Sequence, residues 1–232
     1  MSLDFSYAGV CIPTIAGAPD MTADLLTTLG ADPVVEYITL FVNAPDAVDQ
    51  VKELVARAGL ELDGTATPTI TLMTVGEHLL YPSWNVAIGI ARSVGVPLMI
   101  LNDDIRFPDP DPVSRLVAVW RENPDIAVMG FDHTGDVPPG KLERCTGSYR
   151  HGGIPGFAFG VDPIRVEPVD TRFEWWYGDD DLFRTTELNG YPLARAGVHV
   201  WHEAETTAVR QPWTREAADR DRIRWVDKYG DV

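Results

Sequence analysis

Two short acidic clusters carry the side chains best suited to chemistry in this 232-residue chain. The first, Asn-Asp-Asp at residues 102–104, follows an apolar run that predicts a buried strand. The second, Asp-Asp-Asp at residues 179–181, follows two tryptophans and begins a helix-like stretch. Crowded carboxylates repel one another unless a cation, a proton or water intervenes. The two clusters therefore indicate a divalent cation and a base that works beside it.

The first cluster has the ligand chemistry of a hard divalent cation. Mg²⁺ and Mn²⁺ prefer oxygen ligands and are often held by one or two carboxylates together with substrate phosphates. A strand end that carries Asp103 and Asp104 would suit such a cation. The alternative interpretation is a solvated turn in which Asp104 caps the next element.

The second cluster lies next to aromatic rings. A helix N-terminus favours aspartate through its dipole and its free amides, which would account for one of the three carboxylates. The tryptophans at 175 and 176 directly precede the cluster. Rings beside carboxylates suit a sugar, whose C–H faces are apolar and whose hydroxyls need acceptors. Core packing is the alternative interpretation for each ring.

Two further features point to the same kind of site. His202 stands at the end of a predicted strand, where its imidazole could complete a metal shell, although a structural role is the alternative. The glycine-rich residues 152–157 would let the backbone approach a ligand closely. Neither a phosphate-loop nor a dinucleotide fingerprint occurs, and there is no G-x-S-x-G nucleophile motif.

The elements that must position these residues alternate between strand and helix in the N-terminal half. Apolar runs predict strands at 10–15, 34–42, 69–75 and 96–101, and helices at 21–29, 47–58 (capped by Asp46) and 82–94. This alternation predicts a parallel sheet with helices on both faces. Ligands of such sheets collect at the C-terminal ends of strands, where Asn43 and residues 102–104 fall.

The C-terminal half is less regular. The predicted elements are a helix at 113–120, a strand at 126–131, a loop at 132–141, a hairpin at 145–161, a helix at 179–188, a strand at 194–201 and a polar helix at 214–229. Neither a repeat nor a clear linker interrupts the chain, so we expect one domain.

Composition narrows the functional class. The formal net charge of −16 opposes non-specific binding to nucleic acid. The two cysteines provide no disulfide framework, which fits a reducing, cytoplasmic compartment. We find no signal peptide and no apolar run long enough to span a membrane, so no integral membrane association is expected.

Six segments in order resemble the GT-A fold glycosyltransferases, and in particular the family 2 group that uses nucleotide sugars. They are Cys-Ile-Pro-Thr at 11–14, Phe-Val-Asn-Ala at 41–44, residues 83–89, Leu-Asn-Asp-Asp at 101–104, residues 177–184 and Val-Trp-His at 200–202. The likeness spans roughly residues 8–205. It implies an α/β, GT-A-like single domain over residues 1–232, with a nucleotide-sugar half at about 8–105, an acceptor half at about 106–205 and a helical tail at about 206–232.

The resemblance also implies roles for individual residues. Donor binding would involve Pro13, Thr14, Asn43, Asn85, Asn102 and Asp103. The metal, Mn²⁺ or Mg²⁺, would be held by Asp104 and His202. The general base would be Asp179 or Asp180, and the acceptor would contact Trp175, Trp176 and Gly156. The implied reaction moves a sugar from a nucleoside diphosphate sugar to an acceptor hydroxyl with inversion.

The chain departs from the family pattern at three places. Position 42 is valine where the pattern often has aspartate, so Asn43 would have to contact the base or ribose. Position 102 is asparagine, which makes Asp104 the chief metal ligand. The second acidic motif lacks its glutamate, and its alignment favours Asp179 over Asp180 as the base.

Two other functions remain open at this point. A nucleotidyltransferase should carry a glycine-rich, basic first loop, but residues 16–20 contain neither lysine nor arginine. The other alternative is a non-catalytic module that binds a sugar or a metal. The acceptor stays open among a glycan, a protein and a modified nucleic acid, as do the donor sugar and the oligomeric state.

Overall fold

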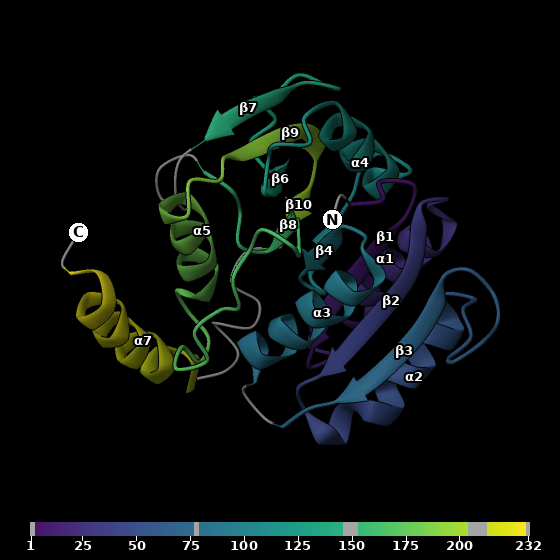
Figure 1. Ribbon diagram of the computed structural model, residues 1–232. Coiled ribbons are helices and arrows are strands. Elements are labelled where there is room, and N and C mark those ends of the chain that lie inside the picture. The colour runs from purple at the N-terminus through teal and green to yellow at the C-terminus, as the bar shows by residue number, and fades with distance from the viewer. Residues whose placement is uncertain (1–2, 77–78, 146–152, 204–212, 231–232) are drawn as a thin grey trace.

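The computed structural model describes residues 3–76, 79–145, 153–203 and 213–230, and a large twisted sheet runs through it (Figure 1). The sheet has the strand order β3-β2-β1-β4-β8-β6-β9-β7. Its strands are β1 (Ala8–Thr14), β2 (Val35–Val42), β3 (Thr69–Thr74), β4 (Leu98–Leu101), β6 (Val128–Asp132), β7 (Leu142–Cys145), β8 (Ala158–Val161) and β9 (Leu193–His199). In these described residues, β8 and β7 run antiparallel to their neighbours and the other strands share one direction.

Helices cover both faces of the sheet, as the sequence pattern predicts. Side chains along β4 point alternately to the two faces of the sheet. Met99 and Leu101 therefore enter one hydrophobic core, and Leu98 and Ile100 enter the other. The first core is covered by α1 (Pro19–Ala31), α2 (Val48–Arg57) and α4 (Pro112–Glu122), and the second by α3 (Leu80–Val94) and α5 (Gly178–Leu188). The expected α/β, mostly parallel architecture is confirmed.

The start of α4 is held by a carboxylate from a distant part of the chain. Asp32, which follows α1, accepts hydrogen bonds from the backbone N–H groups of Val113 (2.8 Å) and Ser114 (3.1 Å). Its other oxygen accepts the Ser114 hydroxyl at 2.5 Å. The residue at the N-cap position itself, Asp111, makes no side-chain cap bond. A buried side chain thus satisfies helix-terminal donors that would otherwise be left without a partner.

Three sequence-based expectations about elements are wrong. Residues 145–161 do not form a hairpin, because β7 and β8 lie apart in the sheet with β6 and β9 between them. Asp46 does not cap the second helix: it lies in a 3₁₀ turn, η1 (Pro45–Ala47), and α2 begins without a side-chain cap bond. The proposed strand at 194–201 is two strands, because β9 ends at His199 and the following residues, Trp201 and His202, pair with a different strand.

That break in the last strand creates a small second sheet. β10 (Trp201–His202) leaves the main sheet and pairs antiparallel with β5 (Ile105–Arg106), which follows β4. His202 lies opposite Ile105 in this pairing. The second sheet therefore places His202, the predicted metal-binding histidine, beside Ile105, which directly follows Asp104.

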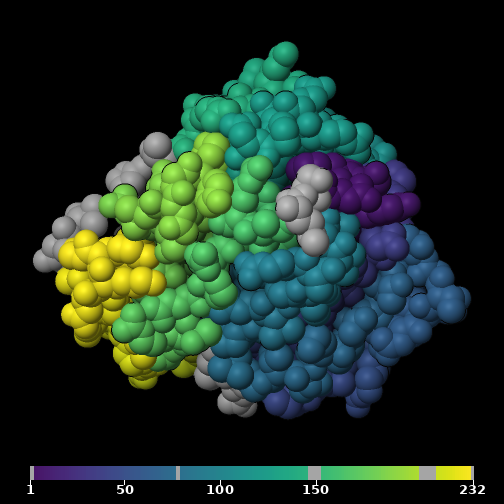
Figure 2. All heavy atoms as spheres, viewed as in Figure 1, coloured from purple at the N-terminus to yellow at the C-terminus, as the bar shows by residue number. Residues whose placement is uncertain are grey.

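The C-terminal helix α7 (Trp213–Tyr229) lies at the periphery of the molecule, beside α5 and the chain that leads into it (Figures 1 and 2). It buries Thr214, Ala217 and Asp221, so most of its surface faces away from the core. None of the helices in the described ranges combines the length and apolar character needed to cross a membrane.

Candidate functional site

The C-terminal ends of β1 and β4 bring together several predicted donor-binding residues. Thr14, the last residue of β1, donates its hydroxyl to the carboxylate of Asp103 at 2.5 Å and accepts the N–H of Ala16 at 2.9 Å. The backbone N–H of Asn43 donates to the carbonyl of Thr14 at 2.9 Å. Pro13 is buried within β1, directly before Thr14. The parallel pairing of β1 with β2 and β4 puts these strand ends at one edge.

Asn43 has an unusual environment for an amide side chain. It is only 5% exposed, and neither its Oδ1 nor its Nδ2 has a hydrogen-bond partner among the described residues. Leaving buried polar groups without partners costs free energy, so such groups need an explanation. A polar ligand at the end of β2 would supply both a donor and an acceptor for this amide.

Burial raises the pKa of the Asp103 carboxyl to about 7, and the charge of Asp104 acts in the same direction. The hydrogen bond from Thr14 and the proximity of His202 oppose this rise in the pKa. Asp103 and Asp104 are thus two adjacent carboxylates that are both buried. A cation beside them would favour the ionised form of both.

Asp104 and His202 form a second polar pair at this edge. The His202 Nε2 atom lies 3.1 Å from the Asp104 Oδ1 atom, and the Asp104 side chain is buried. The backbone N–H of Glu203 also bonds the carbonyl of Asp104 at 3.2 Å. An imidazole nitrogen and a carboxylate oxygen aimed at each other are suitable ligands for Mn²⁺, and the carboxylate also suits Mg²⁺.

The pair would not make a complete metal site by itself. In the described parts of the chain there is no group of three or more His, Cys, Asp or Glu side chains placed to hold a metal ion. Cations of this type usually keep several waters and use substrate phosphates as additional ligands. Asp104 and His202 therefore fit a cation that is shared with a bound diphosphate.

Phe157 connects this pair to the neighbouring loop. Its ring stacks on His202, with centroids 4.2 Å apart and planes 11° apart, and His133 meets the same ring edge-on at 6.0 Å. The carbonyl of Phe157 accepts the N–H of Asn102 at 2.8 Å. The loop before β8 is thus fixed against both the first acidic cluster and His202.

Gly156 brings the second acidic cluster to the same loop. A Cβ atom placed on Gly156 would lie 1.8 Å from the Oδ2 atom of Asp179, so the glycine backbone is packed directly against this carboxylate. Asp179 belongs to the first turn of α5. The predicted base, the predicted acceptor glycine and the Asp104–His202 pair are therefore linked through consecutive residues, 156 and 157.

The other two aspartates of the cluster have different surroundings. Asp181 is 1% exposed and accepts hydrogen bonds from Lys228 Nζ (2.6 Å), the Tyr229 hydroxyl (2.6 Å) and the N–H of Asp170 (3.0 Å). The bonds from Lys228 and Tyr229 attach α7 to α5, which is a structural role. Asp180, the alternative base, is half-buried in the first turn of the helix.

Three predicted ligand-binding residues lie in contacts that hold the fold. The Asn85 amide exchanges two hydrogen bonds with the backbone of Val169, at 2.9 and 2.8 Å. Trp175 packs edge-on against Trp213 with centroids 5.0 Å apart. Trp176 donates its indole N–H to Thr214 at 3.1 Å and is 40% exposed. Their roles in binding a donor or an acceptor stay predictions.

Sequence reasoning missed several residues of this region. Phe157 belongs to the predicted glycine-rich segment 152–157 but had no role of its own there, and His133 follows the end of a predicted strand without any motif. Tyr81 packs its ring on Gly178 and donates its hydroxyl to the carbonyl of Trp175 at 2.8 Å. Asp221 gave no signal, because it stands in a helix with many other charges.

The comparisons with known proteins identify the fold. No protein-family model and no curated protein sequence matches this chain. Among solved structures, TarS 1–349 from S. aureus superposes with a TM-score of 0.57 at 12% identity, covering 86% of this chain and 61% of that one. The same fragment of TarS in complex with UDP gives a TM-score of 0.56. The chain spans less than two thirds of the TarS fragment that is first among these matches.

Two further solved structures of similar fold are named as synthetases or synthases. Glucosyl-3-phosphoglycerate synthase from Mycobacterium tuberculosis, in complex with phosphoglyceric acid, gives a TM-score of 0.58 at 11% identity and covers 93% of this chain and 78% of its own. A CMP:2-keto-3-deoxy-manno-octonic acid synthetase with CTP gives 0.50 at 13% identity, covering 91% of this chain and 100% of its own. At these identities the matches define architecture, and this protein has the GT-A-like fold.

Proposed function

We propose that this protein is a metal-dependent glycosyltransferase that moves a sugar from a nucleoside diphosphate sugar to an acceptor hydroxyl. The observation that carries the proposal is the linked arrangement of Asp104, His202 and Asp179 around residues 156–157, at the C-terminal edge of the sheet. Open α/β sheets bind their ligands at this edge. The GT-A-like fold is consistent with this reaction class.

The nucleoside would lie over the ends of β1 and β2. Asn43 there offers a buried amide without a partner among the described residues, and Thr14 together with Asp103 forms a polar edge beside it. The TarS fragment that shares this fold is known in complex with UDP, which supports a nucleoside diphosphate as the leaving group.

Asp104 and His202 would hold Mn²⁺ or Mg²⁺ at the diphosphate. When bound, such a cation neutralises charge that develops on the leaving phosphates. Asp104 contributes a buried carboxylate, and His202 contributes an imidazole nitrogen whose ring is fixed by stacking on Phe157. Both ligands are therefore held in place before the donor binds.

Asp179 would accept the proton of the acceptor hydroxyl as that oxygen attacks the anomeric carbon of the sugar. The new bond joins the acceptor oxygen to the anomeric carbon, and the bond between that carbon and the diphosphate oxygen breaks. A single displacement of this kind inverts the anomeric configuration. General-base assistance of this type typically contributes about 10²- to 10⁴-fold to a rate. Trp175 and Trp176 would flank the acceptor, which is a glycan, a protein or a modified nucleic acid.

The proposal is tested by the release of nucleoside diphosphate. Purified protein is incubated with a panel of UDP-, GDP-, CDP- and TDP-sugars, with Mn²⁺, with Mg²⁺ and with EDTA, and free diphosphate is measured over time. Slow hydrolysis of one donor, dependent on the cation, supports the transferase. Binding of UDP and Mn²⁺ without turnover of any donor, with or without added glycans, would favour the non-catalytic module instead.

A nucleotidyltransferase is the second candidate, because the CMP-sugar synthetase shares the fold. That reaction would release pyrophosphate from a nucleoside triphosphate. The loop between β1 and α1 contains no lysine or arginine to bind a triphosphate, which argues against it. Incubation with CTP and a panel of free sugars, followed by a pyrophosphate assay, separates the two reactions.

A further inference from the structure

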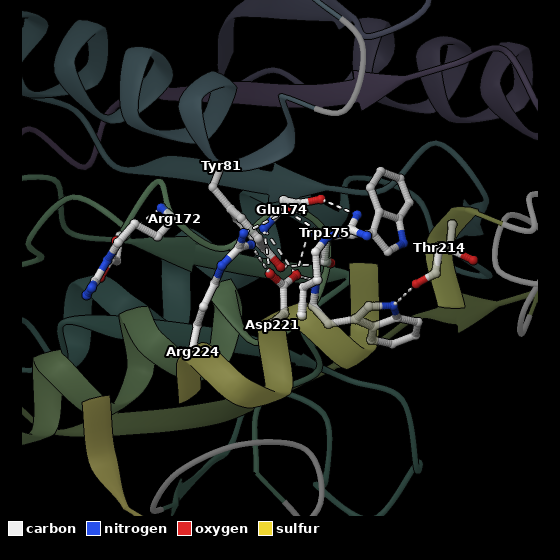
Figure 3. A network of polar contacts seen from close by, with 10 residues as sticks. Tyr81, Arg172, Glu174, Trp175, Thr214, Asp221 and Arg224 are labelled. Atoms are coloured by element: carbon white, nitrogen blue, oxygen red, sulfur yellow. Dashed lines mark hydrogen bonds and ion pairs between the residues drawn. The ribbon is translucent and has the colours of Figure 1, made fainter. Parts of the chain in front are cut away.

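Asp221 occupies a position that a bound anion usually takes. Its side chain is fully buried in α7, and its two oxygens accept the backbone N–H groups of three successive residues, Glu174 (3.0 Å), Trp175 (2.8 Å) and Trp176 (2.9 Å). Consecutive N–H groups that converge in this way form a concavity that binds negative charge. Figure 3 shows Asp221 pointing from α7 into these amides, with Arg224 beside it.

The charges around Asp221 balance. Arg224 donates to Asp221 at 2.8 Å and also lies 2.8 Å from Glu174, and Arg220 binds the same glutamate at 2.6 Å. Two arginines and two carboxylates thus connect α7 to the start of the 174–178 segment. A buried carboxylate that accepts several N–H bonds and pairs with a guanidinium is among the stronger polar contacts in proteins.

The segment that Asp221 holds leads directly into the proposed base. The Trp175 carbonyl is bonded by Tyr81 from α3, Tyr177 adopts a left-handed backbone conformation with φ of 66°, and α5 begins at Gly178. One residue later comes Asp179. The backbone immediately before the proposed base is therefore fixed from one side by α3 and from the other by α7.

A second contact follows the proposed base. Asp181 receives Lys228 and Tyr229, both from the last turn of α7. Asp179 thus stands between two attachment points, 174–176 and 181, that are supplied by one helix. These polar contacts dock α7 together with the ring contacts that Trp213 makes with Trp175 and Trp225 makes with Tyr177.

From this arrangement we infer that α7 orients the proposed base and that Asp221 is a positioning residue for it. Asp221 would act through the 174–178 backbone, without touching substrate. The inference rests on the proposed function, since it assigns Asp221 a purpose in that reaction. Loss of Asp221 should loosen the approach to α5 and displace Asp179 from Gly156, leaving the ends of β1, β2 and β4 unchanged.

The test compares Asp221→Asn with Asp219→Asn, which makes the same change at an exposed position of α7. Hydrogen exchange followed by mass spectrometry needs no ligand. In Asp221→Asn the amides of residues 174–181 should exchange about 10- to 100-fold faster, while the amides of β1 and β4 keep the wild-type rate. Asp219→Asn should match wild type throughout.

The kinetic readout uses the donor found to be hydrolysed by the wild-type protein. Asp221→Asn should lower kcat at least about tenfold and leave the KM for the donor and the Mn²⁺ requirement unchanged, because only the placement of the base is affected. A general loss of structure would instead raise exchange everywhere. Tyr229→Phe, which removes one hydrogen bond to Asp181, is the milder variant and should change exchange at 178–182 and kcat in the same direction.

Wild-type exchange at 174–181 together with wild-type kcat in both Asp221→Asn and Tyr229→Phe would overturn the inference. A rise in donor KM with kcat unchanged would also overturn it, since Asp221 would then act on binding. If the wild-type protein hydrolyses no donor, the proposed function fails. The exchange comparison then still decides whether α7 orders this segment.

Discussion

Gly156 and Asp179 are in direct contact, although they come from a loop and a helix that are separate in the sequence. The glycine presents no side chain, and a Cβ at this position would fall 1.8 Å from the Asp179 carboxylate oxygen. The contact leaves no room for any other residue without movement of the carboxylate. It also joins the proposed base to Phe157, which stacks on His202.

The first prediction follows from this contact. Gly156→Ala should displace Asp179 and lower donor hydrolysis at least about tenfold, with a destabilisation of about 1–3 kcal/mol from overpacking. Gly89→Ala is the matched control, because Gly89 is exposed in α3 with open space around its Cα. That change should stabilise the protein by about 0.5–1 kcal/mol. Equal activity in the two variants would show that the Gly156 contact is unimportant.

Single substitutions distinguish Asp179 from Asp180 as the general base. Asp179→Asn should keep the binding of UDP with Mn²⁺ and lower turnover about 10²- to 10⁴-fold. Asp180→Asn should retain most of the activity. The measurement is diphosphate release alongside calorimetric titration with UDP. The reverse pattern would assign the base to Asp180, and full activity in both variants would remove the base from this cluster.

Metal dependence can be tested at the Asp104–His202 pair. His202→Ala and Asp104→Asn should each raise the Mn²⁺ concentration needed for half-maximal donor hydrolysis by at least about tenfold, because each removes a ligand. His133→Gln is the control, since His133 meets the Phe157 ring edge-on and is not one of the two proposed ligands. An unchanged Mn²⁺ titration in both ligand variants would place the cation elsewhere.

The buried carboxylate at the start of α4 gives a prediction about stability alone. Asp32→Ala should destabilise the protein by about 1–3 kcal/mol, because the N–H groups of Val113 and Ser114 lose their acceptor inside the protein. Asp49→Ala, at an exposed pair with Lys52, should change stability by less than about 1 kcal/mol. Urea unfolding measures both. Similar midpoints for the two variants would contradict the role of Asp32.

The docking of α7 should weaken in acid. Hydrogen bonds from Arg220 and Arg224 lower the pKa of Glu174 from 4.5 to about 2. Because the folded-state pKa is the lower one, the contribution of Glu174 is fully present above pH 4.5 and is lost as the pH falls toward 2. The difference in Tm between wild type and Glu174→Gln should therefore be largest at neutral pH and shrink below pH 4.5. A difference that does not vary with pH would contradict the ion pairs.

The sequence predicts the strand–helix alternation of the N-terminal half because each element there has a local hydrophobic periodicity. The strands of that half also pair with one another in the sheet. The same rule of strand ends brings Asn43 and residues 102–104 to one edge. The sequence does not reveal that β8 inserts between β4 and β6, because the pairing of β8 with these two strands joins distant segments and has no local signal. Asp221 was also hidden, since its partners are backbone N–H groups, which every residue has.

The position of β8 has a mechanical consequence. In the described sheet this four-residue strand is the seam between β3-β2-β1-β4 and β6-β9-β7, so the two parts keep their relative placement through its hydrogen bonds. The seam continues backwards into Phe157 and Gly156. Any hinge motion that separated these two parts of the sheet would therefore displace Gly156 and Phe157, which contact Asp179 and His202.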